Sequence, residues 1–156
     1  MPDAQIQPVL ADAAIEILER MFFLSAMPVE EAPADAGATL VRLAFEGDPP
    51  GRLFLRMSDQ AAASITANFL GKEPSAVSGQ QIAEVGVELA NMICGAVLSR
   101  VESTATFHLR TPEVLSDEPA ISPDCHFVHL ETGEGTLSIF VETETAICRA
   151  AQESAF

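Results

Sequence analysis

Apolar residues near the N-terminus recur every three or four positions, as they do in an amphipathic helix. This spacing predicts a helix over residues 6–25. Pro28 and the stretch EEAPADAGA are typical of a loop, so we expect the helix to end before them. The positions expected to face the core are Val9, Leu10, Ala13, Ile17, Leu18, Met21 and Leu24.

The next two segments alternate with a period of two. Residues 39–46 and 51–57 each place every second apolar side chain on one face, which predicts two half-buried strands. Between them lies Gly47-Asp48-Pro49-Pro50-Gly51, a dense cluster of turn residues. We therefore expect a β-hairpin here.

Helical spacing returns after the hairpin. Ser58 can cap a short helix that continues past Ile65 and stops at Gly71. Ser78-Gly79-Gln80-Gln81 has the pattern of a capping box, in which the first and last side chains satisfy each other's backbone N–H. We expect this second helix to run to about Val101.

The last third of the chain is strand-like. Residues 107–110 precede Thr111-Pro112, and residues 126–131 and 136–142 flank a Thr-Gly-Glu-Gly turn. A short helical tail is expected to close the chain. The order of elements predicts a single α+β domain over residues 1–156, with helices packed on a mostly antiparallel β-sheet.

The composition agrees with a folded domain inside the cell. The 156 residues are 48% hydrophobic, and we find no apolar run that we expect to span a bilayer. The first ten residues lack the basic start of a signal peptide, so we expect a cytoplasmic protein. The net charge of −15 disfavours nucleic acid and anionic membranes as partners.

Cysteine and histidine do not form a recognisable ligand set. Three cysteines stand far apart with no CxxC, which favours free thiols. The three histidines, His108, His126 and His129, have no carboxylate predicted to converge on them. We expect neither a disulfide nor a metal site in this chain.

The helix predicted after Ser78 carries two distinct faces. One is an apolar stripe of ordinary core type, formed by Ile82, Val85, Leu89, Met92, Ile93 and Ala96. The other contains Glu84, Glu88, Asn91 and Gly95, which fall within roughly 60° of one another on a helical wheel. Gly95 and Ala90 are expected to keep the surroundings of Asn91 low. Spacing alone favours a solvated surface for this face.

The segment Glu88-Leu-Ala-Asn91-Met-Ile-Cys-Gly95 changes that interpretation. It resembles the E-x-x-N signature of the CheC, CheX and FliY chemotaxis phosphatases. Glu84 stands where the family more often has Asp or Ser, and Pro112 matches the family's proline at slightly short spacing. ERMFFLSAM and GRLFLRMSDQAAASITANFLG are also similar to a CheX-type domain, so the resemblance covers most of the chain.

The resemblance implies a phosphatase acting on the phosphoaspartate of a CheY-like response regulator. Asn91 would orient the attacking water, Glu88 would pair with the receiver's lysine, and Glu84 and Gly95 would be accessory. Mg²⁺ is expected on the receiver, and no cofactor on this chain. Glu16-Ile-Leu-Glu19 in the first helix has Glu where a second site needs Asn, which implies a CheX-type chain with one site.

Two alternatives share this fold. The chain could be a non-catalytic interaction module that binds a receiver or a motor component, or a purely structural domain held by its sheet edge. The resemblance also implies a homodimer that pairs through its sheets. Segments 128–130 and 137–141 are strongly β-prone, and few lysines are available to guard an edge formed by them.

Overall fold

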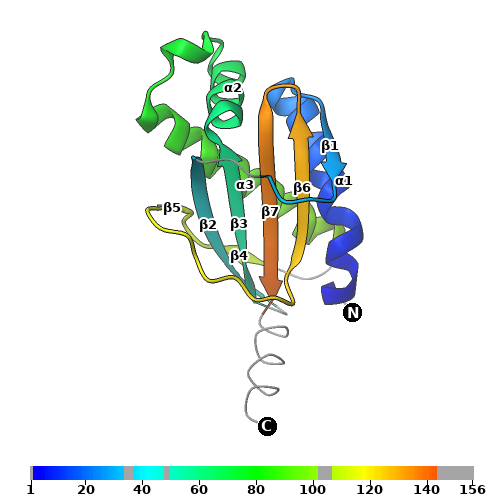
Figure 1. Cartoon of the computed structure of the whole chain (residues 1–156). Coiled ribbons are helices and arrows are strands. Elements are labelled where there is room, and N and C mark those ends of the chain that lie inside the picture. Colours follow the sequence, from blue (N-terminus) through cyan, green and yellow to red (C-terminus); the bar gives the residue numbers. More distant parts are fainter. Residues whose placement is uncertain (1, 34–36, 48–49, 102–106, 144–156) are drawn as a thin grey trace.

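Helices pack on an antiparallel sheet in the computed structural model, which describes residues 2–33, 37–47, 50–101 and 107–143 (Figure 1). The α+β prediction is therefore confirmed. The elements are α1 (Pro2–Phe22), β1 (Ala26–Val29), β2 (Ala38–Glu46), β3 (Gly51–Ser58), α2 (Asp59–Leu70), the 3-10 turn η1 (Pro74–Ala76), α3 (Gly79–Val101), β4 (His108–Leu109), β5 (Glu113–Leu115), β6 (His126–Thr132) and β7 (Gly135–Thr143).

The sheet has the strand order β1-β6-β7-β3-β2-β4, and β5 also pairs with β2. Its register aligns apolar residues in rows across the strands. In one such row Val41 lies opposite Leu55, Leu55 opposite Ile139, and Ile139 opposite Val128, all of them buried. Because side chains alternate along a strand, the residues directly before and after this row in each strand point to the opposite face of the sheet.

The core lies between this apolar face and the helices. Leu10, Leu18 and Phe22 of α1 and Leu89 and Ile93 of α3 are fully buried in it. Figure 1 shows α1 and α3 together behind the sheet, and the two helices are in contact. In the described part of the chain, α3 alone is long and apolar enough by composition to cross a membrane, with a mean hydropathy of 1.5. We did not expect such a helix, and its burial against α1 and the sheet accounts for its apolar residues.

Local signals in the sequence set the ends of α2 and α3 where predicted. The Ser58 hydroxyl accepts the N–H of Ala61 at 3.1 Å, and Gly71 ends α2 with a left-handed φ of 68°. In the capping box, Ser78 Oγ accepts the N–H of Gln81 at 3.1 Å, and Gln81 Oε1 accepts the N–H of Ser78 at 2.9 Å. Both side chains therefore satisfy backbone groups that a helix start leaves unpaired.

The first helix differs from its predicted bounds at both ends. It begins at Pro2 and ends at Phe22, because Phe23 takes a left-handed φ of 55°. The N–H of Leu24 then donates to the carbonyl of Leu18 at 3.0 Å, which holds the chain after Phe23 against the last turn of α1. Residues 26–29, predicted as loop, form β1 and pair with β6.

The prediction of an unguarded edge at residues 128–130 and 137–141 is wrong. These residues lie in β6 and β7, which have partners on both sides, β1 and β7 for β6 and β6 and β3 for β7. In the described chain the outer strands are β1 on one side and, on the other, β4 and β5, which both pair with β2. The predicted helical tail lies outside the described residues.

Candidate functional site

The two residues of the E-x-x-N signature lie on the outer side of α3. Glu88 is exposed and Asn91 is half-buried, one turn further along the same face. Directly behind them, Leu89 and Ile93 are fully buried against the sheet and α1. The core therefore holds the helix backbone while both polar side chains remain accessible.

Glu88 and Asn91 line one hollow of about 660 Å³. Met92 completes the wall formed by α3, and residues 109–112 form the facing wall. The hollow is broad and half polar, and its lining includes the carboxylate, the amide and Pro112, the proline that matches the pattern of the resembled family.

The facing wall is held in place by strand β2. Leu109 pairs with Phe45 in the sheet register, and the N–H of Arg110 donates to the carbonyl of Ala44 at 2.8 Å. The Arg110 guanidinium also forms an ion pair with Glu46. No local sequence pattern indicates Arg110, because its position opposite α3 depends on this long-range pairing.

The accessory residues lie outside the hollow. Glu84 is exposed one turn before Glu88 and accepts a hydrogen bond from Gln80 at 3.3 Å. Gly95 is half-buried, and a Cβ built on it would meet no atom within 4 Å. Neither residue lines the hollow, although both share the face of Glu88 and Asn91.

The prediction that Ala90 borders this open face is wrong, because Ala90 is fully buried. The helix contacts α1, α2, β2 and β3, so its buried arc is wider than the stripe that the wheel assigned. Gly86, Cys94 and Val97 belong to the core as well, whereas Ile82 and Met92 are half-buried. Gly95 is half-buried on the face of Glu88 and Asn91 but does not line the hollow.

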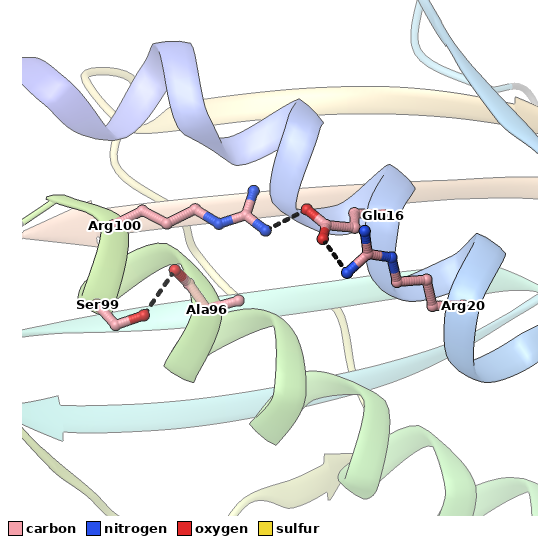
Figure 2. A network of polar contacts seen from close by, with 5 residues as sticks. All are labelled: Glu16, Arg20, Ala96, Ser99 and Arg100. Atoms are coloured by element: carbon pink, nitrogen blue, oxygen red, sulfur yellow. Dashed lines mark hydrogen bonds and ion pairs between the residues drawn. The ribbon is translucent and has the colours of Figure 1, made fainter.

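In α1, the segment Glu16-Ile-Leu-Glu19 has the spacing of the E-x-x-N signature, and Glu16 takes part in a contact between α1 and α3. Glu16 forms an ion pair with Arg20 at 2.8 Å and accepts a hydrogen bond from Arg100 at the end of α3 (Figure 2). The hydrogen bond and positive charge of Arg100, followed by the charge of Arg20, lower the pKa of the Glu16 carboxyl below its ordinary value. This carboxylate therefore has two arginine partners within the chain.

Other titratable groups lie away from the hollow. His129 is buried in the sheet, 2.7 Å from Ser138 Oγ, and burial lowers its pKa. Burial raises the pKa of the Cys94 thiol to about 12. Among the described residues, no three His, Cys, Asp or Glu side chains lie together as metal ligands.

A more enclosed cavity of about 230 Å³ lies on the opposite face of the sheet. Its walls are mainly apolar and include Phe54, Leu115, Ile121 and Phe140. It does not contain the carboxylate and amide pair of α3, so we place the candidate site at the open hollow.

The comparisons with known proteins agree with the helix signature. Residues 39–132, more than half of the chain, match the family model "Chemotaxis phosphatase CheX". A search of curated proteins finds no match.

Solved structures of CheX proteins have the same fold. CheX from Vibrio vulnificus is 20% identical with a TM-score of 0.74, covering 91% of this chain and 98% of that one. CheX from Desulfovibrio desulfuricans is 18% identical with a TM-score of 0.70, at 89% and 99% coverage. CheX in a CheX-CheY-BeF3-Mg²⁺ complex from Borrelia burgdorferi is 14% identical with a TM-score of 0.63, at 89% and 97% coverage. The chain described here belongs to the chemotaxis phosphatase CheX family.

Proposed function

We propose that this protein hydrolyses the phosphoaspartate of a CheY-like response regulator. Water attacks phosphorus, the bond between phosphorus and the aspartyl oxygen breaks, and the electron pair leaves with the carboxylate. The products are free aspartate and inorganic phosphate, which keeps the protons of the water. Such a reaction depends mainly on positioning and electrostatic stabilisation.

Asn91 orients the water in this proposal. Its amide can donate and accept hydrogen bonds but cannot act as a general base. Glu88 forms an ion pair with the receiver's lysine and so fixes the docked register. Mg²⁺ is supplied by the receiver, and a receiver partner implies a cytoplasmic location.

The observation that carries the proposal is the shared hollow. A carboxylate and an amide three residues apart on a rigid helix face Pro112 across a space open to a partner. A docked receiver can bring its phosphoryl group to both side chains at once. Holding reacting groups in one geometry can by itself remove a large part of a reaction barrier.

The test is a single-turnover assay with a phosphorylated receiver from the same cell. Asn91→Ala should lower the rate by roughly 10²- to 10³-fold, as expected for loss of one preorganised hydrogen-bonding group. Gln80→Ala, which removes an exposed amide from the same helix, should leave the rate unchanged. Normal hydrolysis by folded Asn91→Ala would refute the role of Asn91.

Glu88 is tested by charge reversal. Glu88→Lys should weaken binding to a receiver loaded with Mg²⁺ and beryllofluoride by at least about tenfold, because two like charges then meet at the contact. Glu19→Lys makes the same charge change at an exposed position of α1 and should bind normally. Binding of wild type without any hydrolysis would instead favour the non-catalytic interaction module.

A homodimer is part of this proposal. Strand β1 is the outer strand beside β6, and Met27 on it is largely exposed, so β1 is the edge that we expect a second copy to pair with. The hollow is lined by residues of α3 and 109–112, so pairing at β1 would leave a site on each copy. Sedimentation at micromolar concentration should give twice the monomer mass, and a clean monomer would exclude the dimer.

A further inference from the structure

The hollow contains a positive charge in a strongly acidic protein. The sequence has 8 Lys and Arg residues against 23 Asp and Glu residues. Among the described residues that line the hollow, Arg110 is the one cationic side chain. Glu88 brings a negative charge to the same space, where it would repel a phosphoryl group unless a cation balances it.

The backbone of Arg110 is anchored on both sides. Its N–H is bonded to Ala44, and the strands before and after it, β4 and β5, both pair with β2. The side chain is nevertheless 64% exposed and pairs with Glu46, which is itself 56% exposed. Exposed ion pairs contribute little to stability, so the guanidinium can exchange Glu46 for another anion at small cost.

We propose, on the basis of the function proposed above, that Arg110 contacts the phosphoryl group of the docked phosphoaspartate. The guanidinium leaves Glu46 and donates hydrogen bonds to phosphoryl oxygens, a geometry that its planar fork suits. It neither gives nor takes a proton. In the transition state, negative charge is spread over these phosphoryl oxygens, and an arginine stabilises that charge in other phosphoryl-transfer enzymes. This chain thus supplies Arg110 as a catalytic residue in addition to Asn91.

Two substitutions that break the same ion pair separate this role from a structural one. Arg110→Ala removes the cation, and Glu46→Gln removes its partner but keeps the cation. We expect kcat to fall about tenfold to a hundredfold in Arg110→Ala, less than for a lone arginine finger because the receiver's Mg²⁺ and lysine also act. Glu46→Gln should keep kcat within about twofold, and Arg110→Lys should recover part of the loss.

The assay measures kcat and KM with the phosphorylated receiver, with Arg20→Ala as the control for loss of an exposed, ion-paired arginine. An equal fall in Arg110→Ala and Glu46→Gln would show that only the ion pair matters and overturn the inference. A rise in KM with unchanged kcat would overturn it too, because docking alone would explain that result. Asn91→Ala is measured in parallel. If it is inactive while Arg110→Ala is fully active, the Arg110 inference alone fails, whereas full activity of Asn91→Ala overturns the proposed function and this inference with it.

Discussion

Replacing Gly95 with alanine tests the geometry of α3 at the edge of the site. Gly95 lies inside the helix, and the added Cβ would meet no atom within 4 Å. Glycine in a helix interior costs about 0.5–1 kcal/mol relative to alanine. Gly95→Ala should therefore raise the free energy of unfolding by that amount. At about 2–4 °C per kcal/mol for a chain of this size, the melting temperature should rise by about 1–4 °C.

Gly86 in the same helix provides the matched control. It is buried, and a Cβ there would lie 3.0 Å from Met57 Cε and 3.3 Å from Val41 Cγ2. The same gain in helix propensity is then opposed by overpacking, which typically costs about 1–3 kcal/mol. Gly86→Ala should be no more stable than the parent protein. Urea unfolding followed by circular dichroism measures both variants, and an equal gain in both, or a loss in Gly95→Ala, would refute the geometry.

The same variant tests whether Gly95 is an accessory residue. If a receiver approaches α3 closely at this point, the new methyl group should lower kcat/KM for the phosphorylated receiver while stability rises. A stability loss could not explain such a result, because the two changes have opposite signs. Unchanged kcat/KM would remove Gly95 from the site.

The remaining predictions concern the core, α1 and the thiols. Leu89→Asp should unfold the protein, because it places an unpaired charge at a fully buried position; loss of the cooperative urea transition is the measure. Phe23→Gly should stabilise by about 1 kcal/mol in the same experiment, since Phe23 is 76% exposed and has a left-handed backbone. The pKa of Glu16 is lowered, so this carboxylate stabilises the fold at pH values above its ordinary pKa of 4.5. That stabilisation is lost as the pH falls through the lowered pKa. The wild type should therefore lose more stability on acidification than Glu16→Gln. Cys94 should resist iodoacetamide in the folded protein and react in urea, as mass spectrometry of its peptide would show.

Elements with strong local signals could be predicted from the sequence. Ser58, Gly71 and Ser78 with Gln81 each satisfy or bend the backbone next to them, so the helix ends that they set follow from the local sequence. Strands β1 and β5 could not be predicted in this way. They have four and three residues, and each exists because a distant strand, β6 or β2, pairs with it.

The same distinction between local signals and long-range pairing applies to the candidate site. The spacing of Glu88 and Asn91 predicts that they share a helix face, and the structure places both on one hollow. The facing wall is brought there by β2, which no local pattern of residues 109–112 reveals. The expectation for Ala90 fails for a different reason: consecutive residues point about 100° apart on a helix, so Ala90 faces away from Asn91 and toward the core.

One helix therefore supports the core and the site with opposite faces. Leu89 and Ile93 are fully buried on one side, while Glu88 is exposed and Asn91 half-buried on the other. The water-orienting role that we propose for Asn91 needs a fixed position more than it needs chemical reactivity, and a packed helix defines that position better than a loop does. Substitutions at Leu89 should thus act through folding, and substitutions at Asn91 through the rate alone. In α1, by contrast, Glu16 forms an ion pair with Arg100 of α3 and so links the two helices.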